Sequence, residues 1–178
     1  FVTNGANPIT EAATVSGPRA MIEGPDRLLH GGSEEGHWMF NGTETDRIGN
    51  RLRDFHTHSN GWWDLIWTDT SRSASGYPGQ TNQDLVWMLS DKETMQVWIV
   101  IPFCSIANGY GYGTDSVIIK YNCMTGGYTR QLFTGLTLTA GCVFQQQSSA
   151  RRTKFILAPG ASNNLKRFGW KSAPNSSS

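Results

Sequence analysis

Short apolar segments alternate with clusters of turn-forming residues along this chain. The clearest alternation covers residues 95–103, where every second residue from Met95 is apolar. Together with residues 85–89 this segment flanks the charged turn Ser90-Asp91-Lys92-Glu93, a pattern that predicts a β-hairpin. Residues 85–89 lack a strict period of two, so a short helix capped by Thr81 or Asn82 and ending at Ser90 is the competing prediction.

The same kind of pattern predicts further strands. They cover residues 37–40, 62–68, 116–122, 128–134, 136–144 and 153–157. Many short strands with almost no helical periodicity between them indicate an all-β fold. We expect a single antiparallel β-sandwich or barrel, jelly-roll-like, with long loops and at most one or two short helices.

We expect one domain with three parts, because 178 residues is about the length of one domain. Residues 1–36 are rich in Gly and Pro, which predicts an ordered arm or loop layer with at most a short helix near residues 9–13. Residues 37–160 form the expected β-rich core, and residues 161–178 a polar basic tail that frays. Because the first residue is Phe1, we expect a processed product or a piece of a longer chain.

Composition favours turns and strands over solvated helices. Charged residues make up 16% of the chain, below the roughly one quarter typical of soluble domains. Seven Trp, eight Phe and five Tyr supply large side chains for a core despite the many glycines. The longest apolar run, residues 97–103, fits one buried strand and is far too short for a membrane span.

Charge is distributed unevenly along the sequence. Through Asp115 there are seven Lys and Arg against fourteen Asp and Glu, whereas from Ser116 onward there are eight Lys and Arg and no acid. Two interpretations stay open. The halves fold against each other and neutralise, or the basic C-terminal third forms a face that contacts a polyanion such as RNA or a sulphated glycan.

Three cysteines, Cys104, Cys123 and Cys142, occur without a C-x-x-C pair. An odd number in this arrangement fits neither a zinc knuckle nor a dense disulfide framework. We expect them to be mostly buried small apolar residues, with one disulfide left open.

The sharpest chemical motif is Asp54-Phe55-His56-Thr57-His58-Ser59. In an extended segment, both imidazoles of an H-x-H face one side and can share a metal ion. The string resembles the D-x-H-x-H opening of polymerase-and-histidinol-phosphatase-type phosphoesterases and the H-x-H of amidohydrolases, which implies a metal-dependent hydrolase. Those families complete the metal site with downstream histidines, and here no His follows His58. His30 and His37 lie upstream beside glycines.

No complete catalytic or cofactor motif accompanies that segment. There is no G-x-S-x-G nucleophile elbow, and Gly109-Tyr110-Gly111-Tyr112-Gly113 lacks the helix and lysine of a phosphate loop. We therefore expect no cofactor, no metal and no catalytic residue. A small metal- or serine-dependent hydrolase centred on Asp54, His56 and His58 remains the second alternative.

Aromatic residues in turn-rich segments are the candidate ligand-binding positions. Tyrosines between glycines can stack on a sugar ring or pack on a partner with little loss of entropy, and adjacent Trp residues on a strand must place one ring outward. The predicted binding residues are Trp62, Trp63, Tyr77, Tyr110 and Tyr112.

In general character the chain resembles protruding or shell domains of non-enveloped virus capsids: β-rich, low in charge and loaded with Gly, Ser, Thr and Asn. The resemblance implies a non-catalytic structural and binding domain, on the virion surface or extracellular, that acts in assembly and host attachment. Its partners would be copies of itself or neighbouring capsid subunits, and a host receptor or glycan. The first alternative is a carbohydrate-binding module or lectin, in which Trp62, Trp63, Tyr110 and Tyr112 stack on the sugar.

Overall fold

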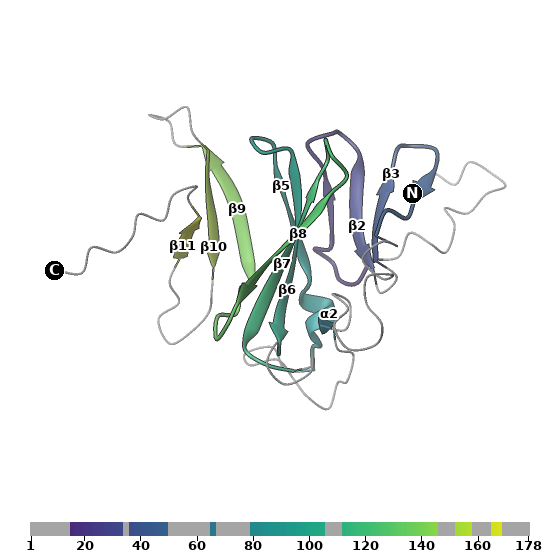
Figure 1. Ribbon diagram of the computed structural model, residues 1–178. Helices are drawn as coiled ribbons and strands as arrows, with labels where there is room; N and C mark the ends of the chain where they lie inside the picture. Colours follow the sequence, from purple (N-terminus) through teal and green to yellow (C-terminus); the bar gives the residue numbers. More distant parts are fainter. Residues whose placement is uncertain are drawn as a thin grey trace.

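The computed structural model describes residues 15–33, 36–49, 65–66, 79–105, 112–145, 152–157 and 165–168. Within these ranges the chain is mainly β, with two four-stranded antiparallel sheets packed together and one short helix. A three-stranded sheet lies on the other side of the central sheet (Figure 1). The predicted all-β sandwich is therefore confirmed. Strands in the two larger sheets follow chain order, so they form meanders and lack the Greek-key order of a jelly roll.

The central sheet contains four strands: β5 (Trp87–Asp91), β6 (Gln96–Cys104), β7 (Asp115–Asn122) and β8 (Tyr128–Phe133). β5 and β6 form the predicted hairpin, which closes through a turn ending at Met95, a non-glycine residue with φ of 52°. Helix α2 (Asn82–Leu85) precedes them, and the Thr81 N–H donates to the Asp84 carboxylate at its start. Each of the two competing predictions for residues 81–90 is thus right for one part of the segment. Residues 82–85 form a helical turn, and the strand β5 begins at Trp87.

Both faces of the central sheet are buried. On the face toward the first sheet, Val97, Ile99 and Ile119 are fully buried. On the opposite face, Trp87, Val100 and Ile118 pack with Leu138 and Val143. Complete burial of such a side chain stabilises the fold by about 1.5–3 kcal/mol relative to exposure. These two apolar layers explain why β6 has a nearly continuous apolar sequence and why β7 has three apolar residues in a row at positions 117–119.

The first sheet contains β1 (Met21–Glu23), β2 (Leu29–Ser33), β3 (Gly36–Phe40) and β4 (Thr45–Asp46). The prediction of an arm or loop layer over residues 1–36 is wrong for residues 21–33, which form two paired strands. The Gly and Pro residues of this segment have specific places in the sheet. Residues 24–28 make the β1–β2 turn. Gly31 leaves room for the Trp38 ring, with which a Cβ at position 31 would collide.

The third sheet has the order β11-β10-β9 and contains β9 (Ala140–Gln145), β10 (Arg152–Leu157) and β11 (Leu165–Phe168). The predicted strand 136–144 starts later, at Ala140. Before it, the N–H groups of Gly135 and Leu138 bond to side chains of Asp115 and Ser116 at 2.7 and 2.8 Å instead of to a neighbouring strand. β11 pairs with β10 inside the segment predicted to be a fraying tail, so that prediction is wrong for residues 165–168.

The described part of the chain contains no helix with the length and hydropathy needed to cross a bilayer.

Candidate functional site

Two histidines lie buried where the first sheet packs on the central sheet. His30 in β2 is fully buried, and His37 in β3 is 1% exposed. The register pairs His37 with Gly32, which is two residues from His30 on β2. Because residues two apart on a strand share a face, both imidazoles project from the same face of the first sheet. They meet Tyr121 of β7, whose ring centroid lies 5.8 Å from that of His30 and 5.0 Å from that of His37.

Four side chains form a continuous line of hydrogen bonds through this interface, which we call the Asp–His–His–Tyr relay. Nε2 of His30 lies 3.0 Å from each carboxylate oxygen of Asp26. Nδ1 of His30 lies 2.9 Å from Nε2 of His37. Nδ1 of His37 lies 2.9 Å from the hydroxyl of Tyr128. The relay therefore begins at the β1–β2 turn and ends on β8.

One assignment of protons satisfies the whole relay. An ionised Asp26 can only accept, so Nε2 of His30 carries a proton and donates it. A neutral His30 then accepts at Nδ1 from the Nε2–H of His37. His37 in turn accepts at Nδ1 from the Tyr128 hydroxyl. Both rings are neutral in this arrangement, and each makes one donated and one accepted hydrogen bond.

Burial controls the charges of the relay. Desolvation lowers the pKa of His30, with Asp26 acting in the opposite direction, and it holds the pKa of His37 well below the usual histidine range. Burial alone would raise the pKa of Asp26, but hydrogen bonds from His30 and from the Leu28 N–H hold it below its usual value. The pKa of Tyr128 is raised by burial and by the neighbouring Tyr121. These directions agree with neutral rings, a neutral phenol and an ionised carboxylate.

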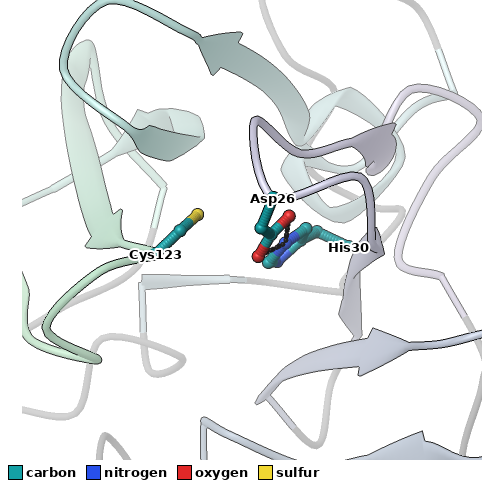
Figure 2. Close-up of side chains that lie close together, drawn as sticks. All are labelled: Asp26, His30 and Cys123. Carbon is teal, nitrogen blue, oxygen red and sulfur yellow. Dashed lines mark hydrogen bonds and ion pairs between the residues drawn. The ribbon is translucent and has the colours of Figure 1, made fainter.

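Cys123 lies beside the acidic end of the relay. One ligand atom each from Asp26, His30 and Cys123 lies within 4.8 Å of the others. Figure 2 shows the Cys123 sulfur pointing toward Asp26, whose carboxylate covers the edge of the His30 ring. Burial and the nearby Asp26 carboxylate raise the pKa of the Cys123 thiol to about 12. Carboxylate, imidazole and thiol are the ligand types of transition-metal sites, so this is where the described residues can hold a metal ion.

Most of the predicted binding residues lie outside the described ranges. These are Trp62, Trp63, Tyr77 and Tyr110, together with the candidate hydrolase segment Asp54, His56 and His58. Tyr112 is described: it is 40% exposed and forms an isolated bridge with Cys104 at the end of β6. The relay brings together none of the predicted binding residues.

The sequence pattern does not identify His30 and His37 as functional residues and shows them only as histidines beside glycines. A usable signal was present in His30-Gly31-Gly32 and Gly36-His37-Trp38. Two histidines seven residues apart on either side of a tight glycine-flanked connection can become neighbours across a hairpin. Asp26, Tyr128 and Cys123 carried no such signal, because they reach the histidines only through turns and through a second sheet.

All three cysteines fall within the described ranges and are free. Cys104 is buried and Cys123 partly buried, as expected of small apolar residues, but Cys142 in β9 is exposed and that interpretation is wrong for it. Burial raises the pKa of the Cys104 thiol to about 12, with Asp115 acting in the same direction.

A separate hollow of about 300 Å³ lies on the first sheet near β4. It is lined by Leu28, Met39, Asn41, Glu44, Thr45 and Asp46. None of the four relay side chains lines it.

Comparison of the whole chain with protein families, with curated proteins and with solved structures found no significant match.

Proposed function

We propose that this chain is a non-catalytic structural and binding domain, a protruding or shell domain of a non-enveloped virus capsid that acts in assembly and host attachment. The observation that carries the proposal is the location of its reactive groups. His30 and His37 are enclosed between two sheets, and the Asp26 side chain is 19% exposed. A substrate would have to separate the sheets to reach the histidines, whereas in a structural domain they join the sheets.

The edge of the central sheet supports self-association. β8 is the last strand in that sheet, and Leu132 on β8 is 43% exposed. An edge strand that carries an exposed apolar residue can pair with or pack against another chain. Thr129 and Arg130 on the same strand are also exposed, which gives this edge a mixed apolar and polar surface. Symmetric assemblies of like subunits use such edges.

Light scattering of the purified chain over a range of concentrations tests this proposal. We expect a defined dimer or trimer that dissociates on dilution, and we expect Leu132→Lys to shift the equilibrium toward monomer. Thr129→Lys adds the same charge to the same strand at a residue that is already polar, so it should leave the assembly largely intact. A chain that stays monomeric at every concentration contradicts the assembly proposal.

The carbohydrate-binding alternative retains one described observation, the exposure of Tyr112. Tyrosine rings at the surface stack on pyranose faces with little loss of side-chain entropy. A monomer that binds an oligosaccharide saturably and loses that binding on Tyr112→Ala, but keeps it on Tyr112→Phe, would support this alternative. Phe preserves the stacking ring and therefore separates ring stacking from hydrogen bonding by the hydroxyl.

A contact between the basic C-terminal third and a polyanion is a further proposal for a partner of this domain. The β10–β11 hairpin pairs Phe155 with Arg167 and Ile156 with Lys166, and it also includes Arg152 and Lys154. Four basic residues thus lie on two adjacent strands of the third sheet, its middle strand β10 and its edge strand β11. Binding to heparin or RNA that weakens steeply with added salt would support it, and absence of binding at low ionic strength would remove it.

A further inference from the structure

The acidic end of the relay brings three metal-ligating side chains together from two turns and from strand β2. Asp26 lies in the β1–β2 turn, His30 follows at the start of β2, and Cys123 lies in the β7–β8 turn. We propose that Asp26, His30 and Cys123 bind one zinc-class divalent ion, which fastens the first sheet to the central sheet. This inference is independent of the assembly proposed above.

The spacing of the ligand atoms is close to that of a tetrahedral site. Zinc binds nitrogen and oxygen at about 2.0–2.2 Å and sulfur at about 2.3 Å, which places ligand atoms roughly 3.3–3.8 Å apart. Nε2 of His30 is 3.0 Å from Asp26, and no pair in the group is farther apart than 4.8 Å. Small side-chain rotations therefore suffice to surround an ion, with the fourth position taken by water.

The ligand types select the class of ion. A thiolate and an imidazole beside a single carboxylate suit zinc and its late transition-metal neighbours. Magnesium and calcium prefer six or more oxygen ligands, and this cluster offers one carboxylate. The binding order should therefore be zinc and cobalt far above magnesium and calcium.

The relay supplies the supporting partner that a metal-bound histidine requires. Such a histidine ligates through one nitrogen and donates from the other. If Nε2 of His30 binds the ion, the proton of the His30 ring moves to Nδ1 of that ring and is donated to Nε2 of His37. The proton of the His37 ring then moves from Nε2 to Nδ1 of His37 and is donated to the Tyr128 oxygen. The relay reverses direction without gaining charge, and the bonds at 2.9 Å are kept.

Charge balance also favours the bound ion. Cys123 releases one proton on binding, so a thiolate and the Asp26 carboxylate together neutralise a divalent cation. A neutral cluster costs far less to bury than either separate charge. The same step removes a thiol that burial otherwise keeps protonated.

Both turns hold their ligands in place. In the first, the Gly24 N–H donates to the Leu28 carbonyl at 2.8 Å and the Leu28 N–H to Asp26 Oδ1 at 3.1 Å. In the second, the Cys123 N–H donates to the Met95 carbonyl at 2.9 Å. The Asn122 side chain accepts from two further N–H groups of that turn. The ligands are thus preorganised before the ion arrives, which lowers the entropic cost of binding.

Cobalt(II) titration of the full, chelator-treated chain tests the site, because cobalt reports its ligands by absorption. We expect one equivalent to bind with a thiolate-to-cobalt charge-transfer band and tetrahedral ligand-field bands, and zinc to displace it. Magnesium and calcium at millimolar excess should leave the spectrum unchanged. A wild-type chain without the thiolate band overturns the proposal, whatever the behaviour of any variant.

Four variants locate the signal. Cys123→Ser should abolish the charge-transfer band and weaken zinc binding at least tenfold, and Asp26→Asn should weaken binding while keeping the band. Cys142→Ser removes an exposed thiol on the third sheet and is the matched control that should bind as wild type. The double variant His56→Ala/His58→Ala should also bind as wild type. A band that survives Cys123→Ser, or that is lost in either control, assigns the ion elsewhere and overturns the proposal.

Discussion

Tyr128 and His37 are ninety-one positions apart in the sequence, yet the tyrosine hydroxyl lies 2.9 Å from Nδ1 of the histidine. This bond joins β8 of the central sheet to β3 of the first sheet, and it closes the line that starts at Asp26. Polar groups at such an interface must be matched, because each buried group without a partner costs about 1–3 kcal/mol. The relay therefore gives the packing of the two sheets a specific register that apolar contacts alone do not provide.

Replacing the tyrosine hydroxyl should destabilise the protein. Tyr128→Phe leaves Nδ1 of His37 without its donor inside the sandwich, and we expect the free energy of unfolding to fall by about 1–3 kcal/mol. Urea denaturation of the metal-free chain measures this change. Tyr112→Phe removes a hydroxyl from an exposed tyrosine and should cost less than about 0.5 kcal/mol. Equal losses in the two variants would contradict the structural role of the relay.

Gly24 should tolerate no side chain. A Cβ at this position would lie 2.5 Å from Asp26 Oδ1 and 2.5 Å from Nε2 of the buried His30. The ring is held by hydrogen bonds on both sides and cannot move away, so Gly24→Ala should cost about 1–3 kcal/mol by overpacking. At Gly127 the nearest atom to an added Cβ is 3.4 Å away, and Gly127→Ala is the matched control. Thermal unfolding that is unchanged by Gly24→Ala would show that the turn is loosely packed.

The sequence predicted the elements of this fold better than their assembly. The alternation in residues 95–103 identified β6 because side chains on one face of a strand recur every two residues, and a local pattern is enough to show that. The same reasoning treated Gly24-Pro25 and Gly31-Gly32 as breaks. Only the structure shows that one pair makes a turn and the other makes room for Trp38.

The relay could not be predicted for a related reason. His30 and His37 are seven residues apart, so a hairpin between them was an inference within reach. Their partners Asp26, Tyr128 and Cys123 become neighbours only when one sheet packs on another, and no local period in the sequence records that contact. Conversely, the prominent Asp54-His56-His58 segment lies outside the described residues, and its role as a hydrolase centre stays a prediction.

Acid should weaken the metal-free protein through its two buried histidines. The groups that face them are Asp26, Tyr121, Tyr128 and Cys123, of which only the carboxylate is charged near neutral pH. Because burial lowers the pKa of His30 and His37 in the folded state, the unfolded chain takes up protons before the folded protein does as the pH falls below about 6.5. Stability is therefore complete above that pH and declines below it, by up to about 1.4 kcal/mol per histidine per pH unit. The lowered pKa of Asp26 adds a loss of the same sign below about pH 4.

Urea midpoints between about pH 7.5 and pH 5 measure this decline in chelator-treated protein. His37→Gln provides the comparison, since glutamine can donate and accept hydrogen bonds but does not titrate in this range. The variant should be less stable at neutral pH and should lose less stability on acidification. A wild-type midpoint that does not change over this range would contradict neutral histidines in the folded state.

The three thiols should differ sharply in reactivity. The thiolate is the reactive form, and with a pKa of about 12 only on the order of one Cys104 thiol in ten thousand is ionised at about pH 8. Cys104 is also fully buried, whereas Cys142 is exposed. Native alkylation followed by peptide mass mapping should therefore modify Cys142 first, Cys123 more slowly and Cys104 only on unfolding. Zinc should protect Cys123 without slowing Cys142, which connects this measurement to the proposed metal site. In denaturant all three thiols should react at similar rates. If Cys104 in the native protein were labelled as fast as Cys142, the core around β6 would open far more readily than its packing indicates.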